Sequence, residues 1–473
     1  MANENYSKLL NAIRSAQGDR FTNAVPAADG TDSNLRTIGS ILTSNLTFMN
    51  DWLNTLYERI ALVRIVTMDG FKNPLAMYKK KLEYGESYVE YATRLVKAKV
   101  RDYNYAKSHF MDIELPEHLS AIFHINCEIH YDTTILPAEL KKAFLSYDRF
   151  AEFLDTEIDN LYRSMEYDEF LAMKYVVARA ILAGDIATKE IPEVNALNAR
   201  EIVTRIKAVS NEMLFMNSKY SKANVETYAK REDQHMLVSS DFTAVVDVNV
   251  LALAFNMDRS KFLAQQVQID GFGELDTDRL DELFANDPMY ETLTAEQLAE
   301  LNKVPAVLMH RDWFVVLDHM TEIYEALNQM GPYRNFSLHC SRTYCFSPFF
   351  KAVAFTVGEQ SITKVELDPD EKEMEKGDIA TFKADVTAVN LANPSVVWTI
   401  EVDDEDEDAE DYYTLDVIDG NTVSVRQIKS WDGTSITEAT LTATSVFDNT
   451  KTGTATITEP ASDDNEPEPS PGP

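Results

Sequence analysis

Histidine and cysteine side chains, which can ligate zinc, gather in two places. They are His339, Cys340 and Cys345 in the stretch LHCSRTYC, with His310 and His319 upstream, and His124, Cys127 and His130. Zinc sites use four nitrogen or sulfur ligands in paired short spacings, and neither group has a second CxxC-type pair. The pattern favours small buried cysteines over a zinc site. His124 and His130 alternate with apolar residues, which is typical of a strand face.

Other chemistry has equally little support. A nucleophilic pair can be drawn between Cys340 and His310, but no local motif accompanies it. The phosphate, dinucleotide, zinc-protease and hydrolase motifs GxxxxGK[ST], GxGxxG, HExxH and GxSxG are absent. The acidic run Glu401–Asp411, EVDDEDEDAED, could bind calcium, but runs of like charge are usually solvated loops. The sequence therefore predicts no enzyme, no cofactor and no metal site.

The elements that would carry these side chains are mixed helix and strand. One long helix is predicted over 146–183, about 50 Å long, with Ser146 as its N-cap. Its apolar residues recur at spacings of three and four: Phe150, Leu154, Ile158, Leu161 and Met165. Shorter helices are expected over Leu197–Met216 and Asp276–Ala285, and strands over Ala306–Leu317 and Lys351–Val357. Because helices and strands do not alternate regularly, the fold class is α+β and not a doubly wound sheet.

Residues 361–460 follow a different pattern. Seven short alternating runs, from ITKVELDP to GTATITE, are separated by turn residues. About seven strands in about 100 residues predict an all-β immunoglobulin-like sandwich, with Trp398 in its core. Residues 461–473, ASDDNEPEPSPGP, hold no large apolar side chain, so we expect a disordered acidic, proline-rich tail.

Charge is distributed unevenly along the chain. The formal net charge is -34, and residues 361–473 hold 7 Lys/Arg against 27 Asp/Glu. Residues 64–107 reverse this balance, with ten basic and five acidic residues. The basic segment is either a solvated face or an arm that docks on acidic neighbours. Three cysteines, no signal peptide and no apolar run of membrane length predict a soluble protein of cytoplasmic origin without disulfides.

Four long stretches resemble the major capsid proteins of short-tailed phages of the phi twenty-nine type. They are NAIRSAQGDRFTNAVPAA (11–28), VDVNVLALAFNMDRSKFLAQQVQIDGFG (246–273), RDWFVVLD (311–318) and SPFFKAVAFTVG (347–358). The resemblance implies an HK-97-like capsid domain over 1–360 and a bacterial immunoglobulin-like group 2 domain over 361–460. Within the capsid domain it implies an N-arm (1–62), an extended loop (63–115), the spine helix (146–183) and a mostly axial domain (184–300).

The resemblance also implies how the subunit would work. The extended loop would lie across a neighbouring subunit, which makes Lys79, Lys80, Lys81, Arg94 and Lys97 candidates for intersubunit contacts. The chain would form hexameric and pentameric capsomers and, with a scaffolding protein and a portal or connector, an icosahedral or prolate head in the host cytoplasm. Packaged DNA would lie on the inner face of the virion. Because DNA would repel the acidic C-terminal domain, we expect this domain to decorate the outside, where it could contact the host cell surface. The alternatives are a bacterial surface or adhesion protein and a hydrolase with a binding module.

Overall fold

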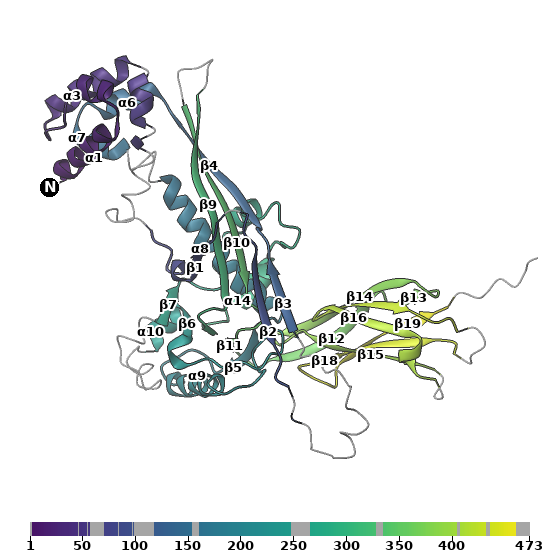
Figure 1. Cartoon of the computed structure of the whole chain (residues 1–473). Coiled ribbons are helices and arrows are strands. Elements are labelled where there is room, and N and C mark those ends of the chain that lie inside the picture. The colour runs from purple at the N-terminus through teal and green to yellow at the C-terminus, as the bar shows by residue number, and fades with distance from the viewer. Residues whose placement is uncertain are drawn as a thin grey trace, which may run out of the picture.

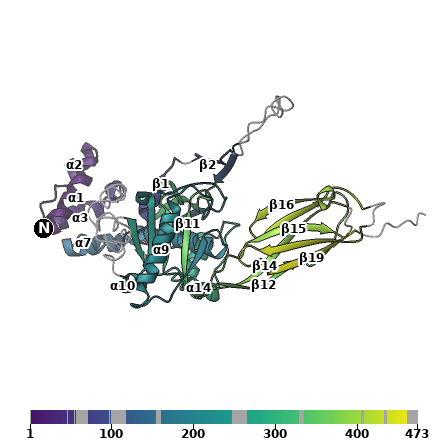
Figure 2. The ribbon, with the colours of Figure 1, turned by 90° about the horizontal axis from the view of Figure 1, so that it is seen from below.

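The structure is a computed structural model that describes most of the chain. The described residues are 2–45, 47–53, 55–56, 71–83, 85–96, 98, 118–153, 160–246, 265–327, 334–403, 407–431 and 436–459. They form a body, residues 2–358, and a C-terminal sandwich, residues 361–459, that projects from one side of it (Figure 1). Figure 2 shows the N-terminal helices and the sandwich at opposite ends of the molecule.

The N-terminal region is helical where it is described. Its helices cluster with two later ones: α1 (Ala2–Ala16), α2 (Asp19–Ala24), α3 (Asp32–Ser44), α6 (Pro137–Ala143) and α7 (Tyr147–Phe153). Thr31 caps α3 by accepting from the backbone N–H of Asn34. The ring of Trp52 packs edge-on against Phe144, with centroids 5.1 Å apart, in the apolar core of this cluster. The predicted N-arm is therefore a packed helical unit over its described part.

A four-stranded sheet runs through the body in the order β1-β9-β10-β4. Its strands are β1 (Lys79–Lys81), β9 (Phe314–Leu327), β10 (Arg334–Phe346) and β4 (Cys127–Ile135). Helix α8 (Asn160–Leu182) packs against this sheet and is buried on nearly all sides. The predicted helix over 146–183 corresponds to α7 and α8, and Leu154 and Ile158 lie outside the described residues. Ser146 caps α7 as predicted, because its hydroxyl accepts from the N–H of Arg149.

The second sheet has five strands in the order β5-β11-β8-β6-β7. They are β5 (Ala187–Ile191), β11 (Ala352–Val357), β8 (Ala306–His310), β6 (Gln234–Ser239) and β7 (Gln266–Ile269). Helix α9 (Ala199–Met213) shares an apolar core with this sheet, and α10 (Ser240–Val245) follows β6 directly. The range predicted to be mostly axial domain, 184–300, contains β5, β6 and β7 of this sheet but not β8 and β11.

The stretch Ala306–Leu317 is extended at both ends as predicted, but it contains two strands and not one. A turn at 311–313 divides it, so that β8 belongs to the five-stranded sheet and β9 to the four-stranded one. The backbone N–H of Trp313 donates to the carbonyl of His310 and closes the turn. Apolar periodicity alone does not reveal this change of sheet, because both halves are fully buried.

Residues 274–303 pack beside α8 and also contact the sheet, through β4 and Tyr344 of β10. They contain α13 (Thr277–Leu283), capped by Asp276, and α14 (Ala295–Leu301), which begins with a capping box of Thr294 and Gln297. Leu280, Phe284 and Leu301 belong to the same apolar core as α8. This segment completes the burial of the helix.

A two-stranded ribbon lies partly within and partly just after the range predicted as the extended loop. It pairs β2 (Tyr88–Thr93) with β3 (His118–Phe123), so the loop reaches beyond the predicted end at 115. Phe123 packs on Val315 and Leu317 of β9 at the base of the ribbon. Strand β1 lies before the ribbon and pairs parallel with β9, so Lys79–Lys81 belong to the central sheet.

The C-terminal region consists of two four-stranded sheets around one apolar core. The first has the order β12-β14-β17-β16, from β12 (Ser361–Asp368), β14 (Ile379–Val389), β17 (Thr422–Gln427) and β16 (Tyr413–Asp419). The second has the order β13-β19-β18-β15, from β13 (Glu371–Glu373), β19 (Thr452–Thr458), β18 (Ala439–Ser445) and β15 (Val396–Val402). The seven predicted strands are all present, and β13 is additional. The relationship to immunoglobulin-like domains stays a prediction.

Two details of the sandwich bear on the sequence analysis. Trp398 is buried in the shared core with Trp431 and Tyr412. The acidic run Glu401–Asp411 is only partly a loop, because its first two residues end β15 and Ala409–Asp411 form a 3-10 turn. The tail after residue 459 lies outside the described residues.

The body and the sandwich meet at a turn after β14. Asn390 and Leu391 both have left-handed backbone conformations, with φ of 54° and 57°. The Leu391 side chain is buried in the apolar core of the body. Asn390 Oδ1 accepts from Lys303 Nζ at 2.9 Å, and its Nδ2 donates to the carbonyl of Glu359. Leu391 is therefore an anchor of the sandwich in the body.

Candidate functional site

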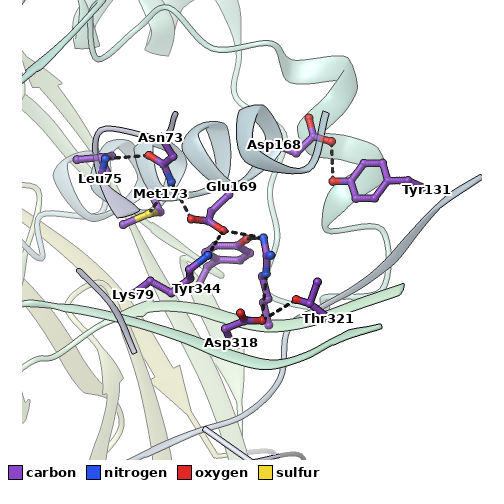
Figure 3. A network of polar contacts seen from close by, with 11 residues as sticks. Asn73, Leu75, Lys79, Tyr131, Asp168, Glu169, Met173, Asp318, Thr321 and Tyr344 are labelled. Atoms are coloured by element: carbon purple, nitrogen blue, oxygen red, sulfur yellow. Dashed lines mark hydrogen bonds and ion pairs between the residues drawn. The ribbon is translucent and has the colours of Figure 1, made fainter. Parts of the chain in front are cut away.

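The strongest concentration of charge inside the body surrounds Glu169, in the middle of α8. Its side chain is 1% exposed. Oε2 lies 2.9 Å from Lys79 Nζ and 2.8 Å from Arg342 Nη1, and Oε1 accepts from Asn73 Nδ2 at 3.0 Å (Figure 3). The carboxylate of α8 is thus contacted from two other parts of the chain, the segment from Asn73 to Lys79 at the start of β1 and the strand β10.

Arg342 extends this network to β9. Its Nε lies 3.5 Å from Asp318 Oδ1, which is an ion pair without hydrogen-bond geometry, and Nη1 donates to the Tyr344 hydroxyl. Thr321 donates to the same oxygen of Asp318. Burial alone would lower the pKa of Arg342, but Tyr344 and Glu169 raise it above its ordinary value. The guanidinium therefore stays charged and holds β9 and β10 in register beside α8.

The neighbouring residue on α8 forms a second contact. Asp168 Oδ2 accepts from the Tyr131 hydroxyl of β4 at 2.8 Å, and Oδ1 lies 2.9 Å from Arg279 Nε of α13. Burial raises the pKa of Asp168, and the hydrogen bond from Tyr131 and the charge of Arg279 oppose this effect. Asp168 therefore connects α8 to β4 and α13, and the adjacent Glu169 connects it to β1 and β10.

Lys174 makes a third contact, about one and a half helical turns further along α8. Its Nζ lies 2.6 Å from Asp270 Oδ1 and donates to the carbonyl of Glu274, at the start of the segment that covers α8. Burial lowers the pKa of Lys174, and the hydrogen bond to Asp270 opposes this effect. Lys79, Asp168, Glu169, Lys174 and Arg342 each have an oppositely charged partner, so the arrangement positions elements and offers no open position for a reactant.

The metal candidates do not converge. His339 stacks on His130 of the neighbouring strand, with ring centroids 5.5 Å apart, whereas Cys340 belongs to the core on the opposite face of β10. His310 stacks on Phe350 in the other sheet. Within the ranges that the structure describes, no three histidine, cysteine or acidic side chains could hold a metal ion together.

The possible nucleophile pair is also separated. Cys340 lies in the core shared by the N-terminal helices and the long sheet, and His310 lies in the five-stranded sheet. Burial raises the pKa of the Cys340 thiol, which disfavours the reactive thiolate. This geometry cannot activate the cysteine.

The five basic candidates for intersubunit contacts have different positions. Lys79 pairs with Glu169 of its own chain, so it belongs to the internal network and not to an exposed loop. Lys80 is more exposed and lies 3.7 Å from Asp312, and Lys81 is exposed. Arg94 follows β2 and is half-buried, and Lys97 lies outside the described residues.

Asp168, Glu169 and Arg342 were not predicted as site residues, although the sequence pattern carries a signal for them. The apolar stripe that ends at Met165 continues three and four positions later at Asp168 and Glu169. Arg342 likewise occupies the buried face of β10, between Cys340 and Tyr344. Charged residues at core positions need partners, and this pattern could have indicated an internal ion network.

Comparison with known proteins identifies the family. The profile of the Phi29-like phage major capsid protein family matches residues 10–356. The chain belongs to this family. It is 30% identical over 400 residues to the major capsid protein of Bacillus phage PZA, covering 83% of this chain and 82% of that protein. It is 29% identical over 401 residues to the major capsid protein of Bacillus phage B103, with the same coverages.

The solved structures that resemble the chain include phage capsids. The capsid structure of Staphylococcus phage Andhra has a TM-score of 0.48 and 12% identity, covering 62% of this chain and 86% of that chain. The family match confirms that the chain is a phage major capsid protein, a virion component and not an enzyme. Its described residues form mixed helices and sheets, as the predicted α+β class requires. The predicted role as a major capsid protein is therefore confirmed. In the described part of the chain, no helix is long and apolar enough to cross a bilayer.

Proposed function

We propose that this capsid protein locks neighbouring subunits together through the β2–β3 ribbon. The observation that carries the proposal is the exposed apolar surface along the ribbon and just beyond β2. Tyr91 and Val96 are each 78% exposed, and Leu95 and Ile122 are each 59% exposed. An isolated two-stranded ribbon is at best marginally stable in water, so such a surface needs a partner. In a repeating shell the partner is another copy of the chain.

The ribbon can be tested without disturbing the fold of the subunit. Ile122→Asp places a charge on an exposed position, so the subunit should remain folded but form no closed shells when co-expressed with its scaffolding protein. Val417→Asp is the matched control, because Val417 is 61% exposed on the sandwich. Circular dichroism and electron microscopy would separate folding from assembly. Normal shells from Ile122→Asp would contradict the proposal.

The exposed lysines of β1 extend the proposed contact to acidic neighbours. Substituting all three lysines would not test it, since a carboxylate at position 79 would face the buried Glu169. Lys80→Glu with Lys81→Glu should impair assembly and leave the subunit folded. Single exposed pairs contribute only about 0 to 1 kcal/mol, but each recurs at every copy of the contact. If the double variant assembled normally, Lys80 and Lys81 would be solvent-exposed residues without an intersubunit contact.

The sandwich is proposed to stand on the outer face of the head, where it contacts the host surface. Residues 361–473 hold 7 Lys/Arg against 27 Asp/Glu, and packaged duplex DNA carries one charge per about 1.7 Å. An inward position would set like charges against each other at every subunit. Capsomers of six and five copies, a scaffolding protein, a portal and DNA on the inner face complete the proposed head.

Protease treatment of filled heads tests the outward position. Cleavage should remove the sandwich without releasing the genome. A truncation that ends at Gly358 should still assemble and package DNA, although its body should melt at a lower temperature because the Leu391 anchor is lost. Protection of the sandwich inside filled heads would contradict the outward position, and failure of the truncated chain to assemble would contradict its dispensability.

A further inference from the structure

A cleft of about 1080 Å³ lies between the body and the sandwich. Its body wall is formed by the C-terminal half of α8, the loop 286–291 and the end of β10. Its sandwich wall is formed by β14 and by the turn that leads into β17. Figure 1 shows that the sandwich joins the body at one end only, and the cleft lies at this end. We call this space the interdomain cleft.

The joint between the two regions fixes the walls of the interdomain cleft relative to each other. Gly184, just after α8, has a left-handed φ of 75°. A Cβ at this position would lie 2.8 Å from Asn393 Oδ1 and 2.8 Å from Pro394 Cδ, so only glycine permits this close approach. Gln360 Nε2 donates to the carbonyl of Leu391, whose side chain is the anchor in the body. The cleft is therefore a built feature and not a gap between loosely tethered domains.

The charged groups of the interdomain cleft favour a basic occupant. Arg179 Nη2 lies 2.6 Å from Glu291 Oε2. Lys222 Nζ likewise lies 2.7 Å from Asp185 Oδ1, so both of these cations are neutralised. The remaining charged residues of the lining are three acids and one base: Glu128, Asp287, Asp385 and Lys383. Within the described ranges, none of these four forms an ion pair. The cleft would thus repel an anion and attract a basic segment.

Apolar side chains also line the interdomain cleft. Met289 is 81% exposed, and Phe346 and Val386 are half-buried on opposite walls. The volume exceeds the usual range for small-molecule pockets, about 300 to 1000 Å³. Because Arg179 and Lys222 are already paired, the cleft has few free donors that could orient a small molecule. A chain segment with both basic and apolar side chains matches this lining better.

The segment just beyond β2 has this composition. Residues 94–107, RLVKAKVRDYNYAK, hold five basic residues and one acidic residue. Leu95 and Val96, at its start, are 59% and 78% exposed. Its charge and its apolar side chains complement those of the interdomain cleft. We propose that the interdomain cleft of one subunit receives the 94–107 segment of a neighbouring subunit.

The position of the ribbon favours a neighbouring subunit over the same one. Residues 124–126 line the cleft, and they directly follow the base of the ribbon at Phe123. Strand β2 runs six residues away from this base, about 17 Å, before the segment begins. In Figure 2, β2 leaves the body on a different side from the sandwich. In a closed ring, a surface of one copy meets a different surface of the next copy, as this contact requires.

This inference rests on the proposed ribbon contact and names the surface of the neighbour that receives it. It also gives the sandwich a part in assembly, because β14 forms one wall of the cleft. A chain that ends at Gly358 keeps only the body wall. Its heads should therefore form, but they should dissociate at a lower urea concentration than heads of the whole chain.

Chemical cross-linking of assembled heads tests the proposal. Val96→Cys and Met289→Cys place thiols at two exposed positions, one in the segment and one in the cleft. A short bis-maleimide should link chains of this double variant into dimers and higher multiples in heads, and should leave free subunits unlinked. The matched control uses Val397→Cys, on the other sheet of the sandwich, in place of Met289→Cys. It should give no more linked chains than Val96→Cys alone, which measures the background from Cys345 in the cleft.

Removal of two acidic charges provides a second measurement. Asp287→Asn with Asp385→Asn keeps the side-chain shapes and removes one charge from each wall. Each exposed charge pair can change an equilibrium constant by up to about fivefold. Heads of this variant should therefore dissociate at a lower urea concentration. Asp241→Asn with Asp416→Asn is the matched control, because it removes one exposed charge from each region outside the cleft.

Other outcomes would contradict the proposal. Heads of the double cysteine variant without linked chains, or with as many as the Val397→Cys control, would exclude the cleft as the docking site. Links within a single chain would place the segment in its own cleft, and links from Met289→Cys to the scaffolding protein would assign the cleft to that partner. If Met289→Cys prevents head formation, Asp385→Cys on the opposite wall takes its place.

Failure of this inference can be distinguished from failure of the proposed ribbon contact. If Ile122→Asp blocks assembly but heads of the cysteine variant show no links, the ribbon docks on another surface of the neighbour. Normal shells from Ile122→Asp would instead contradict the ribbon contact itself.

Discussion

The body and the sandwich differ in the interactions that hold their helices and strands together. The body places paired charges in its interior, with Glu169 and Arg342 at 1% and 2% side-chain exposure. In the described part of the sandwich the core is apolar, and the ion pair between Lys364 and Glu366 is exposed on its surface. Buried ion pairs add little net stability but require specific partners, whereas apolar burial stabilises without direction. We infer that the exact placement of strands and helices relative to one another is more important in the body than in the sandwich. The body carries the ribbon that is proposed to contact a neighbouring subunit.

The largest expected effect comes from breaking the network. Arg342→Met leaves Glu169 without its closest cation and should cost the body about 3 to 5 kcal/mol. Calorimetry of the subunit should show that the body transition moves and the sandwich transition does not. Lys364→Met, in the exposed pair, is the control and should cost about 0 to 1 kcal/mol. Equal losses of unfolding free energy in Arg342→Met and Lys364→Met would show that the buried network stabilises the body no more than an exposed ion pair stabilises the sandwich.

The converse substitution acts on the sandwich. Trp398→Ala removes a large side chain from the apolar core and should cost about 3 to 5 kcal/mol, toward the lower end because the ring keeps 8% exposure. The sandwich should unfold first, and shells should still form. Loss of shells would mean that the two regions depend on each other for folding.

The anchor between the regions should have an intermediate effect. Leu391→Ala should destabilise the body by about 2 kcal/mol, although Leu391 belongs to the sequence of the sandwich. The orientation of the sandwich on assembled heads should also become less uniform in electron microscopy. Val389→Ala, at an exposed position two residues before the anchor, is the control. An unchanged melting transition of the body in Leu391→Ala would show that Leu391 does not stabilise the core of the body.

The last effect concerns pH. Lys351 is 1% exposed, and its Nζ donates to the carbonyl of Phe215 and to Asn217 Oδ1. Burial lowers the pKa of Lys351 to about 8. Between about pH 8 and the ordinary lysine pKa, Lys351 is largely deprotonated in the folded chain and still protonated in the unfolded chain. The free energy of unfolding therefore rises with pH across this range. Lys351→Met should lack this rise in urea titrations, and parallel pH profiles of both proteins would contradict it.

The sequence predicted local elements better than their associations. The seven sandwich strands and the Ser146 cap depend on local patterns, and the structure contains them. The division of 306–317 between two sheets, the internal role of Lys79 and the anchor Leu391 depend on contacts between distant segments. Lys79 shows the difficulty most clearly, since its partner lies 90 residues away and the local basic run resembles a solvated face.

Electron microscopy of the 473-residue chain co-expressed with the proposed scaffolding protein is the most direct test of the proposed assembly. We expect closed shells with the sandwich projecting outward and the β2–β3 ribbon lying across a neighbouring subunit. Soluble monomers at high concentration, or shells in which the ribbon contacts only its own subunit, would contradict it.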